Sequence, residues 1–321
     1  MPLRFLIPTG KVQGAVYLLP GLHFQGADHP EIERFSRILV EAGIVVASPD
    51  IEDYLAMHFN PRAIDDAEAG FKAFANHPLV RSFRPCVMSI SLGSRLALGV
   101  CARNQNAVGS LITFGAYQDW RKALFFCLAG KDDRKHDPLN RPIIFTALQD
   151  QLPDLPEKEA IVQAWLDFVH TTWGQDKFKN KPAMTPIAEE IGKHFVGPAR
   201  QLFLQGLGLA TDGDEIITNG LESGTKLDWL EIRDDLQALS CPLLALHARQ
   251  DDVIECEQSL SLEAQAPTAI RSEVILTGMY SHSGRKLPSP RHLMKELSQL
   301  ITIVSRLTAL TSLSDDIRKD D

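Results

Sequence analysis

Short apolar runs alternate with amphipathic stretches along most of the chain. The runs end in turn-forming residues and have the length of buried strands. They predict strands at 15–20, 44–49, 86–90, 108–117, 242–248 and 272–278. Apolar positions at helical spacing predict helices at 29–43, 60–74, 92–102 and 256–266, and a last helix that begins at Ser289-Pro290. This alternation predicts an α/β protein with a mostly parallel central sheet and helices on both faces.

The alternation stops between residues 117 and 241. This stretch contains helix-like segments at 157–173 and 224–239, but no apolar run that is typical of a buried strand. A crossover between parallel strands needs only about a dozen residues, so the stretch predicts an insertion with structure of its own. We expect a core made of residues 1–117 and 236–321, and a mainly helical cap or lid made of residues 118–235.

Composition and charge narrow the class of protein. Of the 321 residues, 44% are hydrophobic and 23% are charged, which is typical of a globular protein with a sizeable core. The net charge of −8 and the scattered Lys and Arg residues argue against a nucleic-acid partner. No apolar run reaches membrane-spanning length, and Pro8 and Gly10 interrupt the start of the chain before a signal peptide could form. These features predict a cytoplasmic protein with no membrane span.

The five cysteines occur at positions 86, 101, 127, 241 and 256. An odd number without C-x-x-C spacing is typical of free thiols in a reducing compartment. We therefore expect neither a disulfide framework nor a metal site.

The segment PCVMSISLGSRLAL, residues 85–98, passes from a predicted strand into a predicted helix at Ser91. Ser89 and Gly93 flank this serine at two residues on either side, and both are small. The pattern G-x-S-x-G at such a turn is a nucleophile elbow, in which the small neighbours let the strand and the helix approach each other closely. Taken alone, S-x-S-x-G also fits an ordinary tight turn whose hydroxyl caps the helix.

Two further residues complete a set that would activate Ser91. Asp251 follows the strand at 242–248, and His282 follows the strand at 272–278. The carboxyl ends of parallel strands share one edge of the sheet, where open α/β sheets bind their ligands. A serine hydroxyl becomes a good nucleophile when a histidine accepts its proton and an acid orients that histidine. We interpret Ser91 as the nucleophile, His282 as the base and Asp251 as the acid.

Asp252 and His247 are not assigned a catalytic role. We expect Asp252 to point away from the triad. His247 lies within a predicted strand and is interpreted as a core histidine.

On these motifs the sequence resembles the α/β-hydrolase superfamily over most of residues 1–117 and 236–310. LLPGLHFQG (18–26) is similar to the segment after the family's third strand, and SISLGS (89–94) to its elbow. ARQDDVIE (248–255) is similar to the acid loop, and YSHS (280–283) to the histidine loop. The first strands and LITFGAY (111–117) also resemble a group of bacterial α/β-hydrolases. The chain departs from the family at Ser89, where glycine is usual, and at Pro20-Gly21, where His-Gly is frequent.

The resemblance implies further roles. The backbone N–H groups of Leu22 and Leu92 would form the oxyanion hole, with His23 as an alternative to Leu22. Asp119 occupies an alternative acid position that some members use, or it caps the first helix of the insertion. The resemblance implies neither a cofactor nor a metal.

The expected function is that of a serine hydrolase that cleaves a carboxylic ester or a related acyl bond of a small molecule with an apolar portion. Thioester hydrolysis, acyl transfer and carbon–carbon hydrolysis are alternatives on the same triad. A non-catalytic binding module of the same fold is the alternative from another class.

Overall fold

A seven-stranded sheet forms the centre of the protein, which is seen here as a computed structural model that describes residues 2–130, 136–222, 226–278, 280–281, 284–285 and 293–312. The strand order is β1-β3-β2-β4-β5-β6-β7. β1 pairs antiparallel with β3, and every other neighbouring pair is parallel. The strands are β1 (Leu3–Leu6), β2 (Gly14–Leu19), β3 (Ile44–Pro49), β4 (Cys86–Ile90), β5 (Ser110–Phe114), β6 (Leu243–Ala248) and β7 (Ser272–Thr277). A mostly parallel sheet, as predicted, is confirmed.

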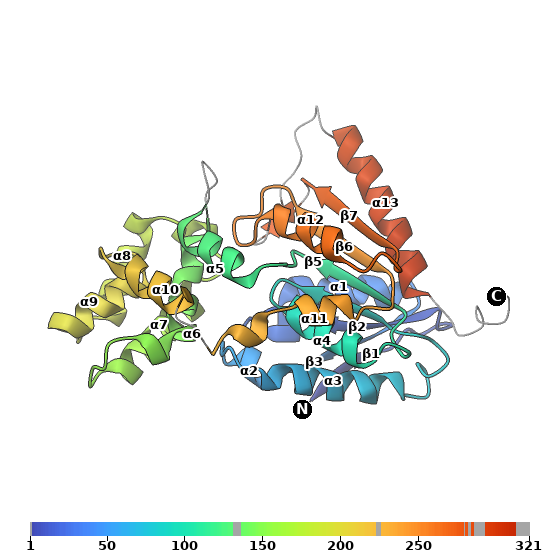
Figure 1. Cartoon of the computed structure of the whole chain (residues 1–321), viewed down its shortest axis with the longest axis horizontal. Coiled ribbons are helices and arrows are strands. Elements are labelled where there is room, and N and C mark those ends of the chain that lie inside the picture. The colour runs from blue at the N-terminus through green and yellow to red at the C-terminus, as the bar shows by residue number, and fades with distance from the viewer. Residues whose placement is uncertain are drawn as a thin grey trace.

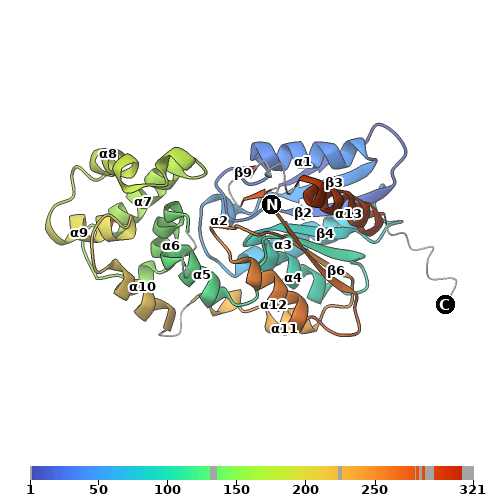
Figure 2. The ribbon, with the colours of Figure 1, turned by 90° about the horizontal axis from the view of Figure 1, so that it is seen from above.

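Helices cover both faces of this sheet (Figure 2). One face packs against α1 (Pro30–Glu41) and α13 (Leu293–Thr311), and the other against α3 (Arg62–Ala75), α4 (Gly93–Arg103) and α12 (Cys256–Gln265). The short helix α2 (Glu52–Leu55) follows β3, and the short helix α11 (Arg233–Gln237) precedes β6. Successive strand residues point to opposite faces, so Val87 of β4 belongs to one core and Met88 to the other. The buried strand residues on both faces are mainly apolar, which explains the continuous apolar runs in the sequence.

Between β5 and β6 the described residues form helices and no strand. The α-helices of this stretch are α5 (Trp120–Ala129), α6 (Arg141–Ala147), α7 (Lys158–Thr172), α8 (Lys181–Ile191), α9 (Gly197–Gly206), α10 (Gly213–Glu222) and the short α11. Most of them lie together on one side of the sheet in both views (Figure 1). Residues 118–235 are called the insertion below.

The insertion has apolar packing of its own. The rings of Phe145 and Trp165 meet edge to face with centroids 5.4 Å apart, and the Trp165 indole N–H donates to the Phe203 carbonyl at 3.0 Å. All three side chains are buried. Part of the insertion is therefore held together by an aromatic core rather than by contacts with the sheet.

Two local features differ from the sequence-based expectation, and a third expectation falls outside the described residues. β1 was not predicted, because it has only four partly buried residues at the edge of the sheet. The strand expected at 108–117 is shorter, since Gly115 has a φ of +65° and ends the extended backbone after Phe114. The described part of the last helix begins at Leu293, and Ser289-Pro290 lies outside the described residues. All five cysteines are free, and four of them are buried.

Candidate active site

The segments that follow the parallel strands meet at one edge of the sheet. They carry Leu22 after β2, Ser91 after β4 and Asp251 after β6, and all three line one cavity. His282 follows β7 but lies outside the described residues. Thr277, the last residue of β7, lines the same cavity.

Ser91 occupies a strained turn between β4 and α4. Its φ is +52°, in the left-handed region that residues other than glycine rarely adopt. The backbone N–H of Ser91 donates to the Phe114 carbonyl of β5 at 2.8 Å, which anchors the turn to the neighbouring strand. Leu92 then returns to helical dihedrals as the N-cap of α4. The backbone therefore has the sharp strand-to-helix reversal that the sequence predicted at Ser91.

Two glycines make room for this turn. A Cβ on Gly93 would lie 2.6 Å from the Pro20 carbonyl oxygen, and a Cβ on Gly21 would lie 3.0 Å from the Ile90 carbonyl oxygen. The loop after β2 and the start of α4 therefore approach each other to within backbone contact. The small residue at position 93 is explained by this approach.

Ser89 stands where a glycine is usual and is completely buried. Its hydroxyl has no hydrogen-bond partner in the described part of the chain. The side chain is small enough for the turn, and the unpaired hydroxyl shows that packing, not polarity, is what this position requires.

The Asp251 carboxylate is fixed by the loop that follows it. Its Oδ1 accepts the backbone N–H groups of Val253 and Ile254, each at 2.8 Å, and the residue is 7% exposed. Asp252 points elsewhere, as predicted, since its Oδ2 lies 2.8 Å from Nζ of Lys179 in the insertion. Asp251 thus faces the cavity, whereas its neighbour faces the insertion.

Asp119 is the N-cap of α5. Its Oδ1 accepts the backbone N–H of Lys122 at 3.1 Å, and its Oδ2 pairs with the Lys122 ammonium at 3.2 Å. The capping interpretation of this residue is confirmed.

His247 is a satisfied core residue, as its position in β6 predicted. Its Nδ1 lies 2.7 Å from the Ser259 hydroxyl and its Nε2 lies 2.9 Å from the Ile254 carbonyl, and the residue is 2% exposed. The same Nε2 is 3.5 Å from Oδ2 of Asp251. His247 therefore supports the loop that carries Asp251 while both of its ring nitrogens are engaged.

Leu22 and Leu92 both line the cavity beside Ser91. Neither backbone N–H donates to another of the described residues. Leu92 is held from the other side, because its carbonyl accepts the Tyr54 hydroxyl at 3.3 Å. Among the described residues these two amides have no acceptor, so each can donate to an oxygen atom in the cavity beside Ser91.

The cavity has a volume of about 700 Å³ and a mainly apolar wall. Its size is within the range of small-molecule sites, about 300–1,000 Å³. The core contributes Leu22, Ile32, Phe35, Ile90, Phe114, Leu246 and Ile254, and the insertion contributes Trp120, Leu124, Cys127, Ile143, Ile144 and Trp173. The insertion therefore forms one wall of the cavity that contains Ser91.

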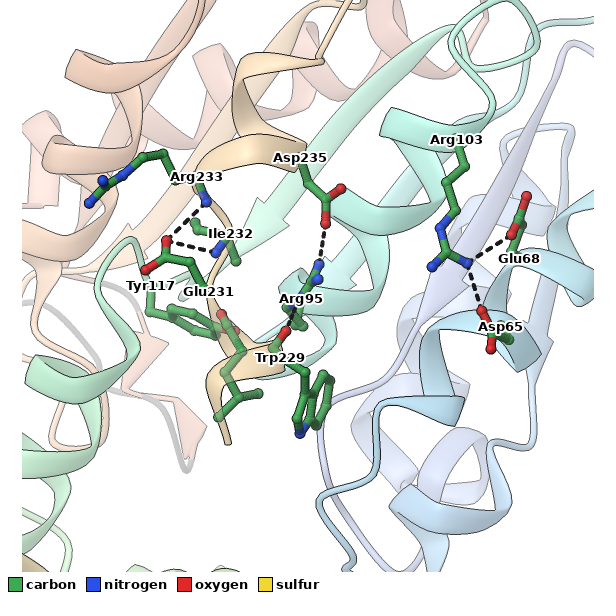
Figure 3. Close-up of polar contacts among 11 residues, drawn as sticks. Asp65, Glu68, Arg95, Arg103, Tyr117, Trp229, Glu231, Ile232, Arg233 and Asp235 are labelled. Atoms are coloured by element: carbon green, nitrogen blue, oxygen red, sulfur yellow. Dashed lines mark hydrogen bonds and ion pairs between the residues drawn. The ribbon is translucent and has the colours of Figure 1, made fainter. Parts of the chain in front are cut away.

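Arg95 of α4 holds the segment that returns from the insertion to β6 (Figure 3). Its guanidinium donates to the Trp229 carbonyl and pairs with Asp235. The Tyr117 hydroxyl donates to the Leu230 carbonyl at 2.9 Å, and Leu230 lines the cavity. α4 starts two residues after Ser91, so these contacts tie the insertion to the helix that presents the serine.

His23, which the sequence left as an alternative to Leu22, packs against the insertion. It lines the cavity, and its ring stacks on Trp173 of the insertion. Burial, followed by the charges of His29 and His170, lowers the pKa of His23 to about 4. Trp173 is distant from His23 in the sequence, so no local sequence pattern indicates that the two rings stack.

No family model matches the chain, and no sequence among the curated proteins matches it. Solved structures do resemble it. Acylaminoacyl peptidase of Pyrococcus horikoshii matches with a TM-score of 0.53 and 12% identity, over 98% of this chain and 40% of the peptidase. A protein named as the non-heme bromoperoxidase BpoC of Mycobacterium tuberculosis H37Rv matches with a TM-score of 0.50 and 12% identity, over 97% of both chains.

The chain has the α/β-hydrolase fold. It spans about 40% of the length of the peptidase that it resembles. Open α/β sheets bind their ligands at the carboxyl edge, and this is the edge at which Leu22, Ser91, Leu92 and Asp251 lie here.

Among the described residues, no group of His, Cys, Asp and Glu side chains is arranged to hold a metal ion. None of the helices in the described ranges combines the length and apolar character that crossing a bilayer requires.

Proposed function

We propose that the protein is a serine hydrolase that cleaves a carboxylic ester, or a related acyl bond, of a small molecule with an apolar portion. The observation that carries this proposal is the position of Ser91, at a φ of +52° on the wall of a mainly apolar cavity of about 700 Å³. Left-handed backbone at a residue other than glycine costs about 1–2 kcal/mol, and such strain is concentrated at active sites.

In the proposed reaction the Ser91 Oγ attacks the acyl carbon while His282 accepts the hydroxyl proton. The carbonyl oxygen becomes an oxyanion and accepts the N–H groups of Leu22 and Leu92. The C–O bond to the leaving alcohol breaks as His282 returns the proton to it, which leaves an acyl-enzyme on Ser91. Water then attacks this ester while His282 accepts a proton from it. The bond between the acyl carbon and Oγ breaks as His282 returns that proton to Ser91, and the carboxylic acid is released.

Asp251 is the proposed partner of His282. Its buried carboxylate, its position after β6 and its place in the cavity wall support this role. The N-cap hydrogen bond of Asp119 and its pairing with Lys122 favour a structural role for that residue.

The insertion is the proposed cap over the acyl group. Its apolar residues form one wall of the cavity, among them Leu124 and Ile144. A roof of this kind limits the access of bulk water to the site and selects the acyl group by shape.

A fluorophosphonate probe with mass-spectrometric mapping tests the proposal. The wild-type protein should be labelled at Ser91 alone, and Ser91→Ala should not be labelled. Ser89→Gly is the matched control, since it restores the usual elbow residue two positions away and should keep the label. Labelling of another serine, or none in folded protein, would overturn the assignment. Hydrolysis of a series of acyl esters then defines the substrate range.

A further inference from the structure

One oxygen of the Asp251 carboxylate is held by the loop that follows this residue. Oδ1 accepts the N–H groups of both Val253 and Ile254, each at 2.8 Å. A shift of the backbone at residues 252–254 would therefore turn the carboxylate with it. We call residues 251–254 the acid loop.

The insertion holds the outer side of this acid loop at three points. The backbone N–H of Asp137 donates to the Asp252 carbonyl at 2.8 Å, and the Cys127 thiol donates to the Val253 carbonyl. Burial raises the pKa of Cys127, so the thiol keeps the proton that it donates. The third point is the ion pair between Lys179 Nζ and Asp252 Oδ2, at 2.8 Å.

Lys179 is the charged centre of this contact. Its Nζ also lies 2.9 Å from Oδ2 of Asp137, whose side chain is only 2% exposed, and the Lys179 side chain itself is 17% exposed. Asp176 completes the group at 3.3 Å, but it is 87% exposed and contributes little. Burial lowers the pKa of Lys179, and the hydrogen bonds and charges of Asp252 and Asp137 more than offset this effect, so the ammonium stays charged.

Removal of this cation would leave two carboxylates close together in a largely dry place. Breaking a buried ion pair from one side is strongly destabilising locally, because the remaining charge has no partner. Asp252 and Asp137 would then repel each other, and the acid loop would move away from the insertion. Asp251, one residue from Asp252, would move with it.

We propose that Lys179 is a positioning residue that fixes the acid loop through Asp252 and thereby orients Asp251. The expected effect of Lys179 on catalysis rests on the proposed triad. Its expected effect on the acid loop rests on geometry alone. In this proposal the insertion affects catalysis, through the orientation of Asp251, as well as the selection of the substrate. Lys179 is not among the described residues that line the cavity, so it has no direct contact with an acyl group there.

The experiment compares Lys179→Met, which removes the charge and keeps the stem, with Lys179→Arg, which keeps the charge. Lys181→Met is the matched control, because Lys181 is exposed and begins α8 two residues away. Amide hydrogen exchange at Val253 and Ile254 measures the hold on the acid loop without reference to activity. Ester hydrolysis measures kcat and KM.

Lys179→Met should accelerate exchange at both amides and lower kcat about 10- to 100-fold, the scale of a misplaced catalytic group, with KM changed less than threefold. Lys179→Arg should keep most of the protection from exchange and most of kcat. Lys181→Met should match the wild type in both measurements. Unchanged exchange in Lys179→Met would overturn the hold on the loop. Faster exchange with unchanged kcat would overturn its catalytic consequence. An inactive wild type would contradict the proposed function instead, and the exchange data would still decide the structural claim.

Discussion

The imidazole of His23 stacks on the indole of Trp173, with ring centroids 5.5 Å apart and planes inclined by 13°. His23 belongs to the loop after β2 that carries Leu22, and Trp173 follows α7 of the insertion. Beside this pair, Phe24 meets His170 edge to face at 4.7 Å. The insertion therefore closes on the core at the cavity through two aromatic contacts, next to the loop that supplies a proposed oxyanion donor.

Replacing Trp173 by Ala should loosen this closure. The variant loses the stacking, which is worth about 0.5–1.5 kcal/mol, and it leaves Oδ1 of the buried Asn140 without the indole N–H that now donates to it at 3.2 Å. We expect amide exchange in residues 20–29 to accelerate and the melting temperature to fall by about 2–4 °C. Trp173→Phe keeps a ring and should lose less. Identical exchange in the Ala variant and the wild type would contradict a closing role.

The His23–Trp173 contact also shows where sequence reasoning stopped. The strand and helix pattern of the core was predictable, because buried parallel strands are continuous apolar runs and each surface helix has one apolar face. β1 was not predicted, since an edge strand with four half-buried residues has no continuous apolar run. The positions of Ser91 and Asp251 were predictable because a parallel sheet brings its carboxyl ends to one edge.

Contacts between the insertion and the core were not predictable. Lys179 and Asp252 are separated by more than seventy residues, as are Arg95 and Asp235, and each looks like an ordinary surface charge in the sequence. Helical periodicity indicates that a face is buried but does not identify its partner. Stacking between a loop histidine and a tryptophan at a helix end leaves no periodic trace at all.

Protonation of His23 should weaken the fold in mild acid. Its pKa is about 4 in the folded protein, below the ordinary histidine value of about 6.5. Between these values the unfolded chain binds a proton that the folded chain does not, so the free energy of unfolding falls as the pH falls from about 6.5 to 4. His29 shifts in the same direction, mainly through burial. His23→Phe should flatten this part of the curve in denaturant titrations, whereas the exposed His194→Phe should not. Parallel curves for His23→Phe and the wild type would be the contrary result.

The close approach at the elbow predicts a steep cost at Gly93. A Cβ there would lie 2.6 Å from the Pro20 carbonyl oxygen and 2.7 Å from the Leu19 carbonyl oxygen, so Gly93→Ala must displace backbone beside Ser91. We expect a loss of about 1–3 kcal/mol in the free energy of unfolding and a marked loss of fluorophosphonate labelling. Gly10→Ala is the control, because nothing lies within 4 Å of a Cβ at that position. Full labelling in a stable Gly93→Ala protein would mean that the turn tolerates a larger residue.

The two candidates for the catalytic acid, Asp251 and Asp119, predict opposite rankings of kcat for their Asn variants. If Asp251 orients His282, Asp251→Asn should lower kcat by about 10⁴-fold, as such a change does in other triads. Asp119→Asn should have a small effect, because Asn is as good an N-cap as Asp and only the pairing with Lys122 is lost. Steady-state kinetics with one ester suffices for the comparison. The reverse ranking would move the acid from the end of β6 to the segment after β5.

The wall that the insertion contributes should set the preferred length of the acyl chain. Leu124 of α5 lines the cavity and is partly buried, so Leu124→Ala should lengthen the available space without moving Ser91. Each methylene that finds apolar contact contributes about 0.8 kcal/mol, or about fourfold in kcat/KM. We therefore expect the optimum of Leu124→Ala to shift to acyl chains one or two carbons longer, and that of Leu124→Phe to shift to shorter ones.

Leu128→Ala separates this effect from a loss of stability. Leu128 lies one turn further along α5, is 8% exposed and does not occur among the described residues of the cavity wall. Its truncation should destabilise the protein about as much while the chain-length profile stays in place. A shift of the profile in Leu128→Ala, or none in either Leu124 variant, would show that the acyl group binds away from the insertion. In that case the apolar wall formed by α5 would serve only the packing of the insertion on the core.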